Sequence, residues 1–210
     1  MKDAVQSVTC QEVTEHGDKD SSRYTVAVWD FGCKENIIRE LMKRGCRVLR
    51  VPSFYTAEQI LALRPDGVML TNGPGDPEEN TRIIAELRKL AGKKPIFGIC
   101  LGHQCIGEAF GGTVSYAKTL FHGKQSEVTH CLDGVFTGID TPVKVARYHS
   151  LAVLRDDLPE CLKVTAQTAD GEIMAMRHKE YPVVGLQFHP ESIYTEHGKR
   201  MIENFLSGVI

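Results

Sequence analysis

Hydrophobic positions beyond Tyr24 fall into short β-branched runs that alternate with stretches of helical spacing. Near-continuous apolar runs of this kind are typical of strands that are buried on both faces of a parallel sheet. The first half of the chain carries such runs at residues 25–30, 47–52, 67–71 and 95–99. Because helical patterns separate them, they predict an α/β domain in which crossover helices join parallel strands.

The stretches between these runs predict the helices. Apolar residues repeat at helical spacing over residues 36–44 and again over residues 83–90. Thr56 followed by Gln59 resembles a capping box and predicts a further short helix between the second and third strands. Each predicted strand of the first half is therefore followed by a predicted helix.

The second half of the chain has a different character. Short segments rich in β-branched residues lie at residues 113–117, 127–130, 142–148, 162–168 and 172–178. The pair Asp170-Gly171 is a hairpin signal between the last two of them. Residues 183–188 predict a final buried strand, and residues 198–206 predict a closing amphipathic helix. This half predicts an antiparallel layer or an antiparallel extension of the sheet.

Residues 1–23 are polar and charged and show no periodicity, so we expect a tail or linker before one domain at residues 24–210. A chain of 210 residues with 42% hydrophobic side chains can bury a full core. Its formal charge is 25 − 27 = −2, which does not favour nucleic acid as a partner. No stretch approaches the ~18 apolar residues that cross a membrane, and we expect a cytoplasmic protein.

The seven cysteines are odd in number and scattered, unlike the framework of a small secreted domain. Most need be no more than small buried hydrophobes, but Cys100 lies in the stretch Gly-Ile-Cys-Leu-Gly between a predicted strand and a predicted helix. That arrangement matches a nucleophile elbow, with cysteine in the place that serine takes in G-x-S-x-G. The following helix N-terminus favours a thiolate at this position.

A thiolate nucleophile needs a base, and His189 is the strongest candidate because it follows the last predicted strand and so can lie at the same sheet edge. Glu191 can orient the imidazole. Backbone N–H groups of Leu101 and of the loop Gly73-Pro74-Gly75 can stabilise an oxyanion, and Gly75 is the expected donor because proline has no N–H. The loop lacks the order of glycine and lysine residues that is typical of a phosphate-binding loop, so acyl transfer is favoured over phosphoryl transfer.

The motifs Asn-Gly-Pro-Gly-Asp-Pro, Phe-Gly-Ile-Cys-Leu-Gly-His-Gln and Gln-Phe-His-Pro-Glu-Ser, in this order, resemble those of the class I (triad) glutamine amidotransferases over Tyr24 to Ile210. The resemblance implies a flavodoxin-like α/β fold with helices on both faces of a mostly parallel sheet and an antiparallel strand extension. It implies that glutamine is hydrolysed to glutamate and ammonia by Cys100, His189 and Glu191, without a cofactor or metal.

The same resemblance implies the substrate contacts. Gly73, Gly75, Leu101 and Gln104 match the glutamine-binding and oxyanion positions. Ser150 and Leu151 match the loop that contacts the amino-acid end of glutamine.

The two halves of the chain resemble different subfamilies. Most of residues 121–198 resembles the amidotransferase subunit of anthranilate synthase and aminodeoxychorismate synthase, which implies that the partner and ammonia acceptor is a chorismate-binding synthase subunit. Residues 28–48 and 63–78 resemble the small subunit of carbamoyl phosphate synthetase. This second resemblance implies an alternative function as the glutaminase subunit of that enzyme. The chorismate interpretation is favoured, because this chain has Tyr148-His149-Ser150 and Pro190-Glu191-Ser192 where the carbamoyl phosphate family usually has an Asn-His-Gly type loop and Pro-Glu-Ala.

Non-enzyme alternatives remain at this point. A zinc-binding module could use Cys100, His103, Cys105, His122 and His130, although their spacing suits no paired-ligand knuckle. A catalytically silent regulatory subunit would keep the fold only. His149 has no carboxylate beside it in the sequence and is interpreted as structural. Lys124 and residues 177–179 are either a solvated face or a docking surface for the synthase.

Overall fold

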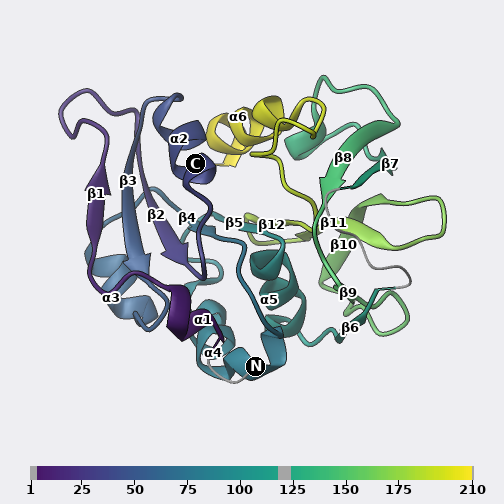
Figure 1. Ribbon diagram of the computed structural model, residues 1–210, viewed down its shortest axis with the longest axis horizontal. Helices are drawn as coiled ribbons and strands as arrows, with labels where there is room; N and C mark the ends of the chain where they lie inside the picture. Colours follow the sequence, from purple (N-terminus) through teal and green to yellow (C-terminus); the bar gives the residue numbers. More distant parts are fainter. Residues whose placement is uncertain (1–3, 118–123, 210) are drawn as a thin grey trace.

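A computed structural model describes residues 4–117 and 124–209 of the chain. Its centre is a parallel sheet, seen in the middle of Figure 1. The parallel strands are, in spatial order, β3 (Cys46–Pro52), β2 (Tyr24–Asp30), β4 (Gly67–Leu70), β5 (Ile96–Ile99) and β12 (Val183–Leu186). This order confirms the α/β prediction, and it brings the carboxyl ends of β4, β5 and β12 to one edge of the sheet.

Helices cover both faces of this sheet (Figure 1). They are α2 (Glu35–Met42), α3 (Ala57–Ala62), α4 (Thr81–Leu90), α5 (Leu101–Ala109) and α6 (Gly198–Val209), with a 3-10 turn, η1 (Pro77–Asn80), leading into α4. A separate hydrophobic core lies on each face of the sheet, and successive residues of β2 point into opposite cores. Val28 packs with α2 and α6, whereas Trp29 packs with α3, α4 and α5. The capping box of Thr56 and Gln59 is present as the sequence predicts.

The antiparallel extension continues the sheet beyond β12 in the order β11-β10-β7-β8. Its strands are β7 (Lys124–His130), β8 (Val143–Arg147), β10 (Leu162–Gln167) and β11 (Ile173–His178), and a 3-10 turn, η2 (Gly134–Phe136), lies between β7 and β8. The predicted hairpin joins β10 and β11, with Gly171 at a φ of +83°. The sequence pattern missed β9 (Leu151–Val153), which forms a separate two-stranded sheet with β6 (Val114–Tyr116).

The described part of residues 1–23 differs from the tail or linker expected from the sequence. It contains the helix α1 (Ala4–Val8) and the strand β1 (Thr14–His16), which pairs antiparallel with β3 at the edge of the main sheet. Val5 is fully buried in the core. A five-residue helix and a three-residue strand are too short to produce a detectable period, which explains why the sequence pattern did not reveal them.

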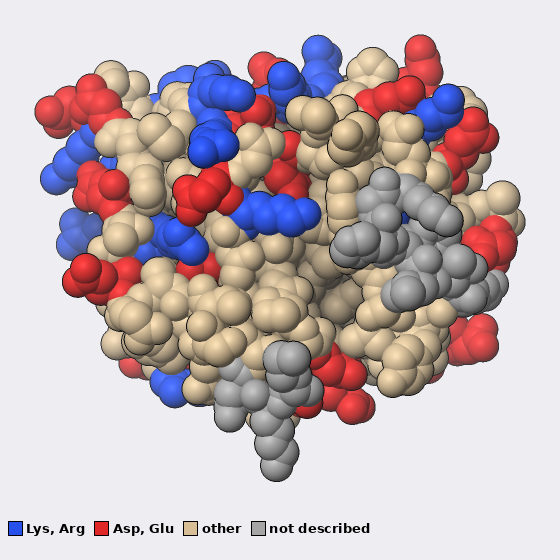
Figure 2. Space-filling model, viewed as in Figure 1, with Lys and Arg blue, Asp and Glu red and all other residues tan. Residues whose placement is uncertain are grey.

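Within residues 4–117 and 124–209, no helix is long and apolar enough to cross a membrane. On the face shown in Figure 2, basic and acidic side chains are interspersed over the upper and left parts, whereas the central and lower part carries few charges. This mixture agrees with the formal charge of −2.

Candidate active site

Cys100 occupies a strained turn between β5 and α5. Its φ of +54° and ψ of −103° lie outside the regions that non-glycine residues adopt at low cost. A Cβ at Gly98 would come within 2.7 Å of the Gly102 carbonyl, and a Cβ at Gly102 would come within 2.6 Å of Leu70. Both glycines are therefore needed for the close approach that produces the predicted nucleophile elbow.

Backbone hydrogen bonds hold this turn in place. The Cys100 N–H donates to Leu186 O at 2.8 Å, and the Gln104 N–H donates to Cys100 O at 3.1 Å. Leu101 is the first residue of α5, so its N–H has no acceptor within the helix. A backbone donor and the positive end of the helix dipole thus lie directly beside the Cys100 sulfur.

His189 lies at the same sheet edge, three residues beyond the end of β12, and is 1% exposed. Its Nδ1 is 2.7 Å from Glu191 Oε1, and its Nε2 is buried without a hydrogen-bond partner among the described residues. Burial lowers the pKa of His189, but Cys100 and Glu191 outweigh it and raise the pKa to about 9. The imidazole therefore retains a proton at neutral pH.

The antiparallel extension anchors this histidine. The His189 N–H donates to Ala146 O at 3.1 Å, and the Thr195 hydroxyl donates to His189 O at 2.6 Å. The same hydroxyl accepts the Ala146 N–H at 3.0 Å. Because Ala146 belongs to β8, the base is tied to the far edge of the sheet as well as to β12.

The predicted oxyanion loop follows β4. A Cβ at Gly73 would lie 2.2 Å from Phe31 O and 2.8 Å from a Leu101 side-chain methyl, so only glycine fits between the two. Gly75 has a φ of +87° and faces Ala4 of α1, where a Cβ would lie 3.2 Å from the Ala4 methyl. The structure therefore places Gly73 nearer than Gly75 to the expected donor residue Leu101.

The remaining predicted substrate contacts meet at the start of β9. Gln104 is 3% exposed, and its Nε2 donates to Leu151 O at 2.9 Å and to Gln187 Oε1 at 3.1 Å. Ser150 is exposed, and its carbonyl accepts the Ala117 N–H at 2.8 Å. Gln104 therefore links α5 to the Ser150–Leu151 turn.

His149 has a structural environment, and the fold brings to it a carboxylate, that of Glu172, which is not its neighbour in the sequence. Its Nε2 is 3.7 Å from Glu172 Oε1 and accepts a hydrogen bond from Arg147 Nε at 3.1 Å, while its Nδ1 is 2.8 Å from Leu151 O. Burial, followed by the Arg147 charge, lowers the pKa of His149 to about 4. A neutral imidazole here supports the turn that carries Ser150.

The described residues of the zinc alternative are not brought together into a metal site. His122 lies outside the described residues, and in the described part of the chain no group of three histidine, cysteine or acidic side chains could hold a metal ion. Cys105 is buried in the core, and the ring of His130 stacks on Phe136. His103 is fully buried against Gly185.

The basic segment 177–179 lies away from Cys100. Arg177 is level with Val184 in the register of β11 and β12, and β11 runs toward the amino ends of the parallel strands. His178 is buried between the rings of Phe110 and Tyr181. This segment cannot surround the opening of the Cys100 site, and the Lys124 side chain lies outside the described residues.

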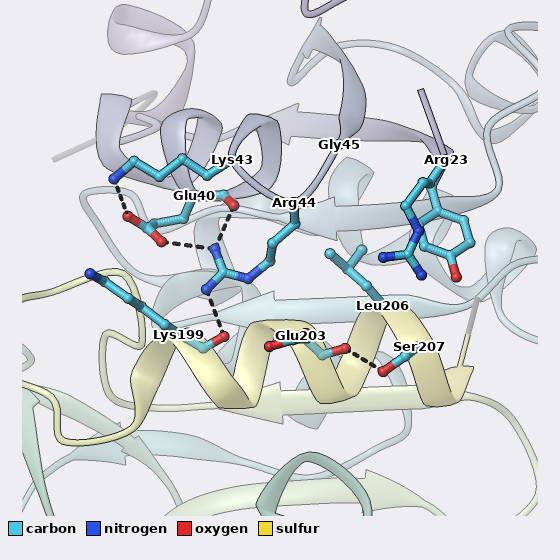
Figure 3. Close-up of a pocket in the computed structure, with 10 residues that line it drawn as sticks. Arg23, Glu40, Lys43, Arg44, Gly45, Lys199, Glu203, Leu206 and Ser207 are labelled. Carbon is cyan, nitrogen blue, oxygen red and sulfur yellow. Dashed lines mark hydrogen bonds and ion pairs between the residues drawn. The ribbon is translucent and has the colours of Figure 1, made fainter. Parts of the chain in front are cut away.

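A cavity of about 550 Å³ lies away from the Cys100 site, between α2, the start of β2 and α6 (Figure 3). Its lining is charged, and three of the charged side chains, Glu40, Lys43 and Arg44, form ion pairs with one another. Glu40 accepts hydrogen bonds from Lys43 and Arg44, each at 2.8 Å, and Arg44 also donates to Lys199 O. This cavity is part of the packing between α2 and α6, and Cys100, His189 and Glu191 are not among the residues that line it.

Comparison with known proteins decides the family. The family model described as glutamine amidotransferase class-I matches residues 27–209. The chain belongs to this family. The strained Cys100 turn and the His189–Glu191 pair of this amidotransferase lie within the matched region, and α1 and β1 lie outside it.

Relatives of this amidotransferase carry names from chorismate metabolism. It is 48% identical over 172 residues to aminodeoxychorismate/anthranilate synthase component 2 of Bacillus subtilis, in a match that covers 81% of this chain and 89% of that protein. It is 52% identical over 156 residues to anthranilate synthase component 2 of Pseudomonas aeruginosa, with coverages of 72% and 78%. It is 50% identical to the bifunctional protein TrpGD of Thermotoga maritima but spans only 26% of that longer protein.

Among solved structures, the amidotransferase is similar to a protein of Thermoplasma acidophilum proposed to be part of a GMP synthase, with a TM-score of 0.77 and 26% identity. The match covers 87% of this chain and 92% of that chain. It agrees with the mostly parallel sheet and the helices on both of its faces.

The hydrophobic pattern gave no sign of two further residues near His189. Lys34 Nζ lies 3.5 Å from His189 Nδ1 and 4.3 Å from the centre of the Tyr148 ring, and that ring packs edge-on against His189. The signal that could have revealed Lys34 is its place just after β2, whose carboxyl end shares the sheet edge with β4 and β5.

Proposed function

We propose that this amidotransferase hydrolyses glutamine at Cys100 and passes the ammonia to a chorismate-aminating synthase subunit. The observation that carries the chemistry is the buried His189–Glu191 pair, whose free Nε2 lies at the same sheet edge as a strained, glycine-flanked cysteine. The named relatives support the acceptor, because they are component 2 proteins of anthranilate and aminodeoxychorismate synthases.

In the proposed reaction, the Cys100 thiolate attacks the side-chain carboxamide carbon of glutamine. The developing oxyanion accepts hydrogen bonds from the Leu101 N–H and from the Gly73–Gly75 loop. The His189 imidazolium then gives its proton to the departing nitrogen, which leaves as ammonia and a glutamyl thioester remains. His189, now neutral, removes a proton from water as the water attacks the thioester, and glutamate is released.

The amino-acid end of glutamine is proposed to contact the turn of Ser150 and Leu151. Gln104 supports that turn through its hydrogen bond to Leu151 O and contributes the glutamine contact expected from the sequence. Because Gln104 Nε2 is already hydrogen-bonded, its contact with the substrate uses the side-chain oxygen, which accepts from the glutamine ammonium group.

All seven cysteines are free thiols. Free thiols persist in reducing compartments, so they support the proposed cytoplasmic location. The product formed by the synthase is anthranilate, aminodeoxychorismate or both, because that chemistry belongs to the partner subunit.

Replacement of Cys100 tests this proposal. The Cys100→Ser variant, when bound to a chorismate-binding synthase subunit, is expected to lose glutamine-dependent amination of chorismate and to keep amination supported by ammonia salts. Replacement of the buried, inert Cys105 by alanine is the matched control and should keep both activities. Loss of both activities in Cys100→Ser, or glutamine-dependent formation of carbamoyl phosphate without any chorismate amination, would contradict the proposal.

A further inference from the structure

The segment from Asp30 to Asn36, between β2 and the first turn of α2, crosses the active site from the oxyanion loop to the base. At one end, Asn72 Nδ2 donates to Gly32 O at 3.0 Å, and the Lys34 N–H donates to Asn72 Oδ1 at 3.2 Å. Asn72 directly precedes Gly73 of the oxyanion loop. A displacement of this segment would therefore displace the loop.

At its other end, the same segment contacts the base and its orienting carboxylate. Asn36 Nδ2 donates to the backbone carbonyl of Glu191, and Lys34 Nζ lies 3.5 Å from His189 Nδ1. The ammonium group also lies 4.3 Å from the centre of the Tyr148 ring, and that ring meets the imidazole edge-on at 5.1 Å between centres. Two separate elements thus fix where the Lys34 charge sits.

Asp30 holds this segment rigidly. The residue is completely buried, and its carboxylate accepts hydrogen bonds from the Gly32 and Cys33 N–H groups at 2.9 and 2.7 Å. Arg50 Nε and the Cys10 N–H also donate to it, each at 2.8 Å. Burial opposes ionisation, but these donors outweigh it and hold the pKa of Asp30 below its usual value. The turn that presents Lys34 is therefore built around a carboxylate with several charge-assisted bonds.

We propose that Lys34 is a positioning residue for the catalytic base, held against His189 by the Asp30–Asn36 segment that also supports the oxyanion loop. The proposal rests on the roles given above to Cys100 and His189. Lys34 acts through the imidazole and not on glutamine itself.

The positive charge of Lys34 lies beside Nδ1 of the imidazole. His189 also faces Cys100, Glu191 and the Tyr148 ring, with His149 near enough to be influenced by its charge. The Cys100 and Glu191 side chains strengthen the hold of the imidazole on its proton. An ammonium group near Nδ1 opposes them, because two like charges repel. Lys34 thereby makes the imidazolium a better acid toward the departing ammonia.

The test compares Lys34→Met with Lys34→Arg, and the exposed Lys93→Met is the control for loss of a surface lysine. The pKa of His189 is followed by NMR of the imidazole in the free enzyme, with the signal assigned by its loss in His189→Gln. Lys34→Met is expected to raise this pKa by about one unit. The variant should also lower kcat for glutamine hydrolysis about tenfold, with a smaller change in KM.

Lys34→Arg keeps a positive charge at the site, so it should restore the pKa and most of kcat, and Lys93→Met should match the unmodified enzyme in both. A His189 pKa in Lys34→Met equal to that of the unmodified enzyme would overturn the proposal, even if the variant were less stable. The Cys100→Ser variant distinguishes failure of this proposal from failure of the proposed function. Glutamine turnover by Cys100→Ser would refute the proposed function. An unchanged His189 pKa in Lys34→Met would refute only the role of Lys34.

Discussion

Cys100 is distinguished from the other cysteines by its backbone and its neighbours. Burial raises the pKa of the Cys33 thiol to about 12 and that of Cys46 to about 11, so both thiols remain protonated near neutral pH. Cys100 instead sits at a helix N-terminus beside an imidazole that retains a proton. The glycines that flank it and His189 with Glu191 were all identifiable from the sequence, because each lies in a short motif that follows a strand.

His103, in the same motif as Cys100, has a different role. Its ring is completely buried, and burial lowers its pKa to about 3. In the unfolded chain, a histidine has a pKa of about 6.5 and binds a proton when the pH falls below that value. The folded protein keeps this ring neutral down to about pH 3. His103 therefore costs stability as the pH falls from 6.5 toward 3.

A pH series of unfolding tests this account of His103. The stability difference between the unmodified protein and His103→Leu should shift in favour of the variant on acidification, by up to about 1.4 kcal/mol per pH unit. Urea unfolding at pH 7, 6 and 5 measures this difference, and the other titrating groups cancel because both proteins contain them. Parallel pH dependences of the two proteins would contradict this account, because they would show that folding does not lower the pKa of His103.

At the scale of elements, the segment before β2 stabilises the turn that supports the active site. The Thr9 hydroxyl donates to Asp30 O at 2.7 Å and accepts the Ser53 N–H at 2.8 Å, so one buried group joins the ends of β2 and β3. Val8 and Pro74 both lie close to Gly32. Residues 4–10 thus pack against the same turn as the oxyanion loop, although they lie outside the region matched by the family.

Thr9→Val tests the contribution of this segment. The substitution preserves the shape of the side chain but leaves a buried N–H and a buried carbonyl without their partner, so it should lower the free energy of unfolding by about 1–3 kcal/mol. Thr14→Val, at an exposed position of β1, is the control and should change it by less than about 0.5 kcal/mol. Equal effects of the two substitutions in urea unfolding would mean that the Thr9 bridge is not formed.

The elements that the sequence predicted are longer than those that it missed. The missed elements depend on contacts with residues distant in the sequence. Strands and helices with several apolar residues in period, such as β2 and α4, were placed within two residues of their ends. β1, β9 and α1 have three to five residues each and depend on partners distant in sequence. The contact between Lys34 and His189 spans 155 positions, and no local pattern encodes it.

At the scale of the whole molecule, the proposed catalytic pair joins two parts of one sheet. Cys100 comes from the parallel part, and His189 is anchored through Ala146 to the outer strand of the antiparallel extension. The sequence predicted that an extension exists, but its strand order depends on pairings between distant segments. That order explains why β8, which carries no catalytic residue, is needed to hold the base.

The central claim is that glutamine becomes covalently attached to Cys100. The most direct measurement is mass spectrometry of peptides from enzyme quenched in acid during glutamine turnover, with the synthase partner bound. The proposed mechanism predicts a glutamyl group on the peptide that contains Cys100. The ratio of this thioester to the rate of glutamine turnover should be larger in His189→Gln than in the unmodified enzyme, because hydrolysis of the thioester needs the base. A glutamyl group on another cysteine, or turnover without any thioester, would contradict it.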